Sequence, residues 1–121
     1  MPEQTKVKRM VSSTLAQEIS VMEADLFSAF SDPTRILMLY ALNEQPRNVG
    51  ELASEVQVSQ SAASRHLKVL RDRGLVVAER QGTNIEYRLA DQRLIQALDL
   101  LRAIMRDRIA YSASLMEVAA P

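Results

Sequence analysis

The sequence contains no cysteine and only one histidine, His66. Without cysteine the protein can form no disulfide, no thiolate metal site and no thiol-based redox switch. A single histidine also excludes a zinc site built from several histidines of one chain. We therefore expect no metal centre and no cofactor.

Aromatic residues, glycine and proline are scarce as well. Of 121 residues, 4% are aromatic, three are glycine and four are proline, whereas 47% are hydrophobic. The core must therefore consist of aliphatic side chains and methionine. So few helix-breaking residues predict long helices with few turns, and the length suits one compact domain.

Long hydrophobic runs are also missing. The first residues, MPEQTKVKRMVSST, contain no apolar stretch of signal-peptide length. No window approaches the roughly 18 apolar residues that a membrane span requires. We expect a soluble, cytoplasmic protein with no membrane partner.

The order of secondary structure begins with two helices. Residues 1–12 are polar and basic, which predicts a flexible tail, and residues 13–118 are expected to form one domain. From about Thr14 to Phe30, apolar residues recur every three or four positions, as in an amphipathic helix. Asp32 and Pro33 suit the cap and first position of a second helix, which is apolar almost all round and so expected to be central.

A short helix, a tight turn and a capped second helix follow. Asn48, with Glu51 three residues later, resembles a capping box and opens the short helix. Ser59 is expected to cap the next helix, which runs to about Arg73 and ends at Gly74. Two strand-like runs, LVVAERQ and IEYRLA, then flank Gly82 and predict a β-hairpin. A last long helix is capped by Asp91. The fold class predicted is mainly α with a small β-hairpin, a winged helix-turn-helix.

Charge is distributed unevenly along the chain. The formal net charge is zero, with 15 basic and 15 acidic residues. Residues 1–57 hold five Lys/Arg against eight Asp/Glu, a net charge of −3. Residues 58–90 hold six against three, a net charge of +3. The positive excess therefore lies on the second helix of the helix-turn-helix and on the hairpin, which favours a nucleic-acid partner.

The helix over residues 60–72 has two different faces. Ala63, Leu67 and Leu70 share the face expected to pack on the preceding helices. The other face combines small residues near the N-terminus with longer polar ones, and a slim leading turn of this kind can enter a DNA major groove. An ordinary amphipathic surface helix would look similar, but the short helix before it and the hairpin after it favour DNA reading. The candidate DNA-binding residues on this helix are Gln60, Ser61, Ser64, Arg65, His66 and Lys68.

Three of these candidates, and the hairpin, have distinct expected roles. Arginine can pair with guanine and glutamine with adenine, which suits Arg65 and Gln60 to base reading. His66 lies at the border of the two faces, where a structural or phosphate-contacting role is expected rather than metal binding. In the hairpin loop, Arg80 and Thr83 are placed to contact the DNA backbone or minor groove.

The first and last helices carry more apolar residues than a core of this size needs. A second copy of the chain is the partner expected to cover them, which would make the protein a homodimer. The alternative is packing of the same helices within a monomer. The candidate interface residues are Leu15, Ile19, Met22, Leu94, Leu98, Leu101 and Met105.

These pieces together resemble the ArsR/SmtB family of bacterial winged-helix repressors. The similarity runs from about Leu26 to Met105 through FSDPTRILMLYAL and NVGELASEVQVSQSAASRHLKVLRDRGLVVAERQGTNIEYRL. It implies a homodimer that binds an operator, usually an imperfect inverted repeat, and releases it when an inducer binds. It also implies DNA contacts by Gln60, Ser61, Ser64, Arg65 and His66, with Arg80 and Thr83 in the wing.

The family's usual sensing ligands are absent from this sequence. Leu52, Ala53 and Ser54 stand where some members have metal-binding cysteines, and the last helix, DQRLIQALDLLRAIMRDR, has no histidine. Its aspartates could form an all-oxygen metal site, but pairing with neighbouring arginines, as between Asp99 and Arg102, is the simpler expectation. The signal is therefore expected to be non-thiol, and three choices stay open: an unknown small-molecule effector, a partner protein, or regulation by the abundance of the protein alone.

Two other functional classes compete with a DNA-binding regulator. A winged helix can serve as a dimerisation or protein-docking module without DNA binding, but such a module has no need of the basic outer face on residues 59–73. An enzyme is not expected, because the chain has no cysteine nucleophile, one histidine and no glycine-rich phosphate loop.

Overall fold

The computed structural model describes the backbone of residues 3–119 and the side chains of residues 13–118. The chain forms two compact units, Met1–Ala90 and Asp91–Pro121. The predicted division into a flexible tail (residues 1–12) and one domain (residues 13–118) stays a prediction, because the side chains of the tail lie outside the described residues.

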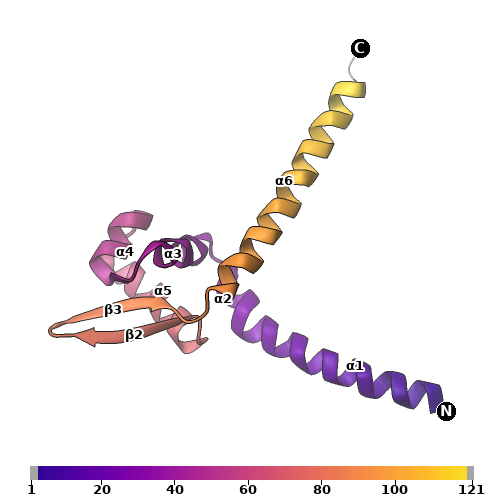
Figure 1. The fold of residues 1–121 in the computed structure, drawn as a ribbon, viewed down its shortest axis with the longest axis horizontal. Helices are drawn as coiled ribbons and strands as arrows, with labels where there is room; N and C mark the ends of the chain where they lie inside the picture. Colours follow the sequence, from indigo (N-terminus) through magenta and orange to yellow (C-terminus); the bar gives the residue numbers. More distant parts are fainter. Residues whose placement is uncertain (1–2, 120–121) are drawn as a thin grey trace. The chain divides into compact units, whose positions relative to one another are not determined.

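The first unit opens with one long helical segment in three parts. Helix α1 covers Glu3–Met22, the π-helical turn η1 covers Glu23–Phe27, and α2 covers Ser28–Phe30 (Figure 1). The backbone stays right-handed and helical at both joints, Met22 and Phe27. The predicted helix over residues 14–30 is therefore present, but it begins earlier and contains a wider turn. That turn was not predicted, because an apolar spacing of three and four does not distinguish α from π geometry.

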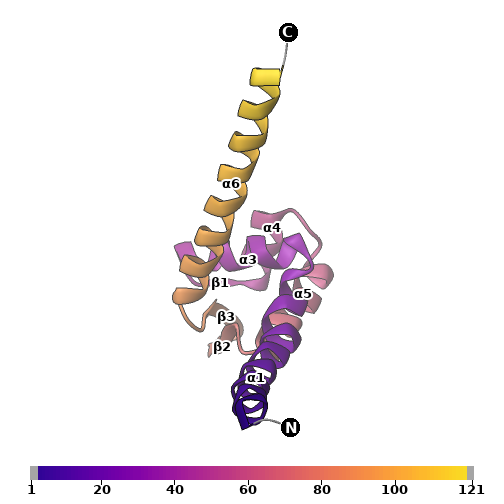
Figure 2. The ribbon, with the colours of Figure 1, turned by 90° about the vertical axis from the view of Figure 1, so that its right-hand side faces the viewer.

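Helix α3, Pro33–Glu44, begins where the sequence predicts. The Asp32 carboxylate accepts a 2.8 Å hydrogen bond from the Thr34 backbone N–H, and Pro33 occupies the first helical position. Four side chains of α3 are buried, in agreement with its predicted central place: Met38, Leu39, Ala41 and Leu42. Figure 2 shows α3, α4 and α5 gathered together in this unit.

The helix-turn-helix consists of α4, Val49–Val56, and α5, Gln60–Asp72. Asn48 Oδ1 accepts from the Glu51 N–H at 2.8 Å, and Glu51 Oε1 accepts from the Asn48 N–H at 3.0 Å, which confirms the predicted capping box. The Ser59 hydroxyl accepts from the Ala62 N–H and so caps α5. Gly74 follows α5 with a φ of 75°, a left-handed conformation that favours glycine.

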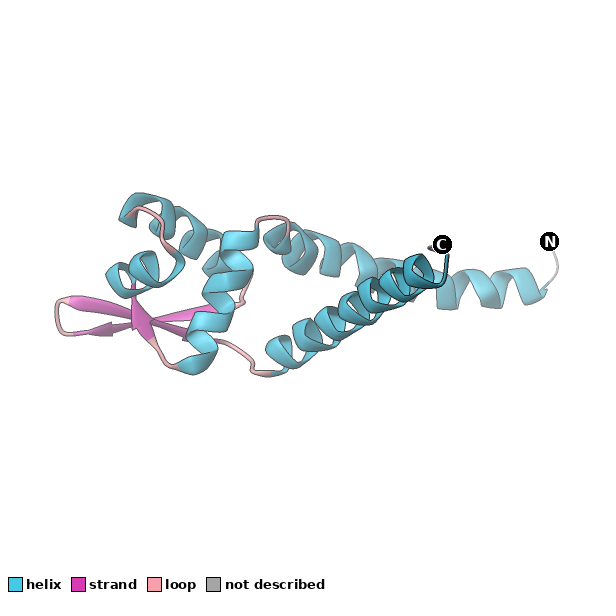
Figure 3. Cartoon of the chain, turned by 90° about the horizontal axis from the view of Figure 1, so that it is seen from above, coloured by secondary structure: helices cyan, strands magenta, loops and turns pink. Residues whose placement is uncertain are grey.

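A small antiparallel sheet completes the first unit. Strands β2, Val76–Gln81, and β3, Asn84–Leu89, form the predicted hairpin, which projects from the helices (Figures 1 and 3). Gln81 pairs with Asn84, so the loop has two residues and begins at Gly82, whose φ is 63°. A two-residue strand, β1, Arg47–Asn48, pairs with β3 and gives the order β1-β3-β2. The third strand was not predicted, because two residues carry no periodicity of their own.

The core of the first unit is aliphatic, as the composition predicts. The largest fully buried side chains are Met38, Leu39, Leu52, Leu67 and Leu70. Because they come from α3, α4 and α5, they hold the helix-turn-helix in one fixed arrangement and leave one side of α5 outside the core.

The second unit is formed by α6, Arg93–Ala119. Asp91 Oδ1 accepts from the Arg93 N–H at 2.9 Å, so Asp91 caps the start of the helix as predicted. Large apolar side chains are exposed along most of its length, from Leu100 to Val118. In the described part of the chain, no helix is long and apolar enough to cross a membrane.

Candidate nucleic-acid interface

Helix α5 separates its apolar and polar residues as the sequence predicts. Ala63, Leu67 and Leu70 have no exposed surface. Five of the six DNA-binding candidates on this helix lie on its exposed side: Gln60, Ser61, Ser64, Arg65 and Lys68. The helix therefore presents a slim leading turn of serines and, one turn later, two cations.

The cations on this face are available to a ligand. Within the described residues, neither Arg65 nor Lys68 forms an ion pair. Arg71, at the end of the helix, lies 3.9 Å from Asp72, a weak exposed contact. A cation that has no protein partner can neutralise a phosphate or pair with a base edge without first breaking an internal interaction.

Gln60 packs against the start of α4. A Cβ placed on Gly50 would lie 3.1 Å from the Gln60 Nε2, so the absence of a side chain at Gly50 leaves room for the glutamine amide. Gln60 and Ser64 also line a cleft of about 640 Å³ between α4, α5 and the hairpin. Thr83, Asn84 and Tyr87 of the hairpin also line it. The cleft places two α5 candidates and one hairpin candidate around the same space.

His66 lies differently from the other candidates. Its side chain is 18% exposed and lies against the start of α3, where Nδ1 is 3.3 Å from Arg35 Nη1 and Nε2 is 3.8 Å from Asp32 Oδ2. The pKa of the Asp32 carboxyl lies below its ordinary value, chiefly because the Thr34 backbone N–H donates to it, with the nearby His66 and Arg35 adding to the effect. Of the two roles expected for His66, this geometry favours the structural one.

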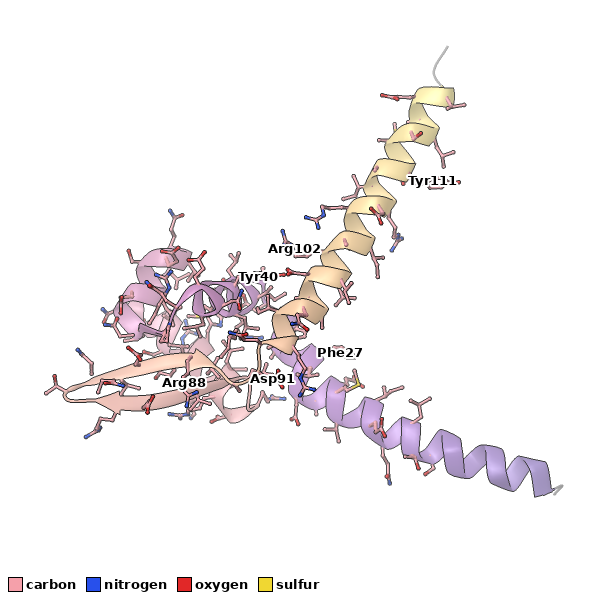
Figure 4. All side chains as sticks on the ribbon, viewed as in Figure 1. Phe27, Tyr40, Arg88, Asp91, Arg102 and Tyr111 are labelled. Atoms are coloured by element: carbon pink, nitrogen blue, oxygen red, sulfur yellow. The ribbon has the colours of Figure 1, made fainter. Side chains whose placement is uncertain are left out.

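The hairpin carries its polar residues on its exposed surface. Arg80 and Thr83 are exposed, and Arg80 stands opposite Ile85 in the register. Arg88, seen on β3 in Figure 4, lies 3.8 Å from the Glu79 carboxylate on β2. Arg80, one residue pair away from the loop, is closer to it than Arg88, which stands opposite Val77.

The candidate dimer residues are divided by exposure. Leu15, Ile19 and Met22 on α1 are exposed, as are Leu101 and Met105 on α6. Leu94 is half-buried, and Leu98 is only 6% exposed within the single chain. Further apolar residues of α6 that were not among the candidates, such as Ile104 and Ile109, are exposed as well.

No metal centre is evident among the described residues, in which no group of three or more His, Cys, Asp or Glu side chains comes together. Arg93 hydrogen-bonds to Asp91 at 2.7 Å and lowers the pKa of that carboxyl to about 2. Arg102 lies 3.3 Å from Asp99, the pairing expected from the sequence. Two of the aspartates considered for an all-oxygen site are thus engaged by arginines.

Comparison with known proteins agrees with this geometry. Residues 32–77, from the cap of α3 into β2, match the model of the family described as bacterial regulatory protein, arsR family. The transcriptional regulator NmtR of Mycobacterium tuberculosis is 38% identical over 88 residues, 73% of each chain. The chain belongs to the ArsR family. It is therefore a transcriptional regulator of the winged helix-turn-helix class and not an enzyme.

Two further comparisons cover a similar part of the chain. The transcriptional repressor SmtB homologue of Synechocystis is 34% identical over 90 residues, which is 74% of this chain and 68% of that protein. The crystal structure of Rv0081 from M. tuberculosis superposes with a TM-score of 0.70 at 31% identity, covering 78% of this chain and 96% of that one. The sequence prediction of both the family and the fold is confirmed.

Several residues that shape this interface were not candidates from the sequence. Arg35 entered only within the segment FSDPTRILMLYAL, yet its guanidinium contacts His66 and the first two residues of α2, Ser28 and Ala29. No sequence pattern indicates a role for Gly50 or Ser28. Gly50 matters because of its contact with Gln60, and Ser28 because of its hydrogen bond with Arg73, and neither partner is a neighbour in sequence. Arg35 alone could have been singled out from the sequence. It follows the helix-starting Pro33 by two residues, where capping requires no cation, so its presence indicates a partner elsewhere in the fold.

Proposed function

We propose that the protein is a homodimeric transcriptional repressor that binds an inverted-repeat operator and is released by a non-thiol signal. The observation that carries this proposal is the exposed face of α5, beside an exposed hairpin. Small polar residues lead on this face, and two cations follow that have no ion-pair partner in the described part of the chain. Bound over a promoter, such a dimer would block transcription, and the names of relatives such as the SmtB homologue support a repressor.

The side chains of α5 divide into base readers and backbone contacts. Arg65 is assigned to a guanine edge and Gln60 to an adenine edge, because those pairings are bidentate. Ser61 and Ser64 allow close approach and donate to bases or phosphates, while Lys68 neutralises a phosphate. From the hairpin, Arg80 and Thr83 contact the backbone or the minor groove.

Dimerisation would use α1 and α6. Both helices expose large apolar side chains, including Leu15 and Ile19 on α1 and Leu101 and Met105 on α6. Two-fold pairing would bring two copies of α5 to successive major grooves, about 34 Å apart, which requires an operator with two half-sites. The same symmetry is the reason for expecting an inverted repeat.

The signal has to act without cysteine. Such a signal would be an organic effector or a partner protein, and either would act by favouring a dimer geometry that no longer fits two successive grooves. The proposal does not depend on which of the two is used.

The experiment that tests this function is fluorescence anisotropy of the purified protein on the DNA upstream of its own gene. A scrambled duplex of equal length and composition serves as the control, at near-physiological salt. A preference of about a thousandfold or more is expected of specific recognition. A folded dimer that shows no preference would contradict the proposal and favour a protein-docking module instead.

A further inference from the structure

Two arginines connect α5 to the end of the first helical segment. Arg35 on α3 donates through Nε to the Ala29 carbonyl at 2.7 Å and through Nη2 to the Ser28 carbonyl at 3.2 Å. Arg73, which ends α5, donates through Nη1 to the Ser28 hydroxyl at 2.8 Å. Both arginines thus converge on Ser28, the first residue of α2.

His66 brings the middle of α5 into the same network. Its Nδ1 lies 3.3 Å from Arg35 Nη1, and a guanidinium can only donate, so Nδ1 must accept. The proton of the neutral imidazole then lies on Nε2, which faces the Asp32 carboxylate at 3.8 Å. His66 is thereby held between a cation and an anion that both belong to the start of α3.

The network lies directly after the π-helical turn. The turn η1, Glu23–Phe27, widens the helix just before Ser28, and the Ser28 hydroxyl donates back to the Ala24 carbonyl at 2.5 Å. Single π turns inside α-helices are frequent at functional sites. Here the turn precedes the one point at which, among the described residues, Arg35 and Arg73 both bind the first helical segment.

We propose that Ser28, Arg35, His66 and Arg73 form a relay that fixes the orientation of α5 to that of the helical segment α1–η1–α2. In this relay, which rests on the proposed function, His66 and Arg35 are positioning residues for operator binding rather than DNA contacts. A change in the geometry of α1 at a dimer interface is transmitted to α5 through these four side chains, which gives a signal acting on the dimer a route to the DNA-reading face.

A double-mutant cycle tests the relay against direct DNA contact by His66. The variants are Arg35→Gln, His66→Leu and their combination, measured by anisotropy on the operator. Each single variant is expected to bind the operator about tenfold more weakly than the parent protein. The double variant should lose no more affinity than the single variant with the larger loss, because the effects of substituting residues in contact are not additive. His66→Asn is expected to restore most of the affinity, since its Oδ1 can accept from Arg35 in place of Nδ1. Additive losses, or no rescue by His66→Asn, would overturn the proposal.

Arg47 offers a matched control. It too donates through Nε to a carbonyl six residues earlier, that of Ala41 at 3.2 Å, but its other partners are Glu44 and Glu55, on α3 and α4. The losses of operator-binding free energy caused by Arg47→Gln and by His66→Leu should therefore be additive in the variant that carries both substitutions. The salt dependence separates the roles further, because removing a side chain that neutralises a phosphate lowers the slope of log K against log salt by about one, whereas disruption of the relay leaves the slope unchanged.

Hydrogen exchange of the free protein separates failure of the relay from failure of the proposed function. Arg35→Gln and His66→Leu are expected to speed exchange of α5 amides together, and Arg47→Gln to leave them unchanged. If this exchange pattern is found but the protein shows no preference for the operator, the relay is supported and the proposed repressor function is contradicted. Unchanged α5 exchange in both relay variants would reject the relay, whatever the DNA binding.

Discussion

The two faces of α5 can be tested by substituting neighbouring residues, Leu67 and Lys68. Leu67 has no exposed surface, so Leu67→Ala removes buried methyl groups from the centre of the helix-turn-helix core. Leucine-to-alanine changes in cores cost about 2–5 kcal/mol, out of a total of roughly 5–15 kcal/mol for a domain. We expect a loss of unfolding free energy in that range, measured by urea denaturation.

Lys68→Ala is the matched comparison, because Lys68 is exposed and forms no ion pair within the described residues. Its effect on stability should stay within about 0.5 kcal/mol. DNA binding should weaken about equally on specific and random duplexes, and the salt slope should fall by about one for each phosphate that Lys68 neutralises. A large stability loss for Lys68→Ala, or a Leu67→Ala variant as stable as the parent, would refute the assignment of the two faces.

Three further predictions concern the ends of the helices. Asn48→Ala removes the acceptor of the α4 capping box and should cost about 1 kcal/mol, which thermal denaturation would register as a fall in Tm of about 4 °C; an unchanged Tm would mean that the box does not stabilise α4. Arg93→Ala should raise the pKa of the Asp91 carboxyl from about 2 towards its ordinary 3.8, as followed by NMR titration, and a pKa that stays near 2 would assign the shift to another group. Because folding lowers this pKa, the stability that Asp91 contributes is present above about pH 4 and is lost as the pH falls through about 2. This component of acid unfolding should be smaller in the Arg93→Ala variant, which keeps only the backbone N–H bond to Asp91.

The sequence predicts the helix-turn-helix well because its signals are local. A capping box needs only Asn48 and Glu51, a helix end needs only Gly74, and the two faces of α5 follow from a spacing of three and four. The hairpin was predictable for the same reason, since its loop requires a glycine at the first position. These elements were found within a residue or two of their predicted places.

Features that depend on distant partners could not be predicted. Strand β1 exists only because Arg47 and Asn48 pair with β3, some forty residues later. His66 was placed at the border of two faces, but only the fold shows that it faces Arg35 and Asp32.

The central claim, that α5 reads the operator sequence, is tested most directly by the Arg65→Ala variant. The measurement is the ratio of dissociation constants on scrambled and operator DNA, for the variant and the parent protein at one salt concentration. Each bidentate arginine–guanine contact contributes about 1–3 kcal/mol of discrimination. Removal of this side chain at both half-sites should therefore lower the ratio roughly 30-fold or more, while binding to the scrambled duplex changes little. Equal losses of affinity on both duplexes would show that Arg65 contacts the backbone and would contradict the account of α5 as the reading helix.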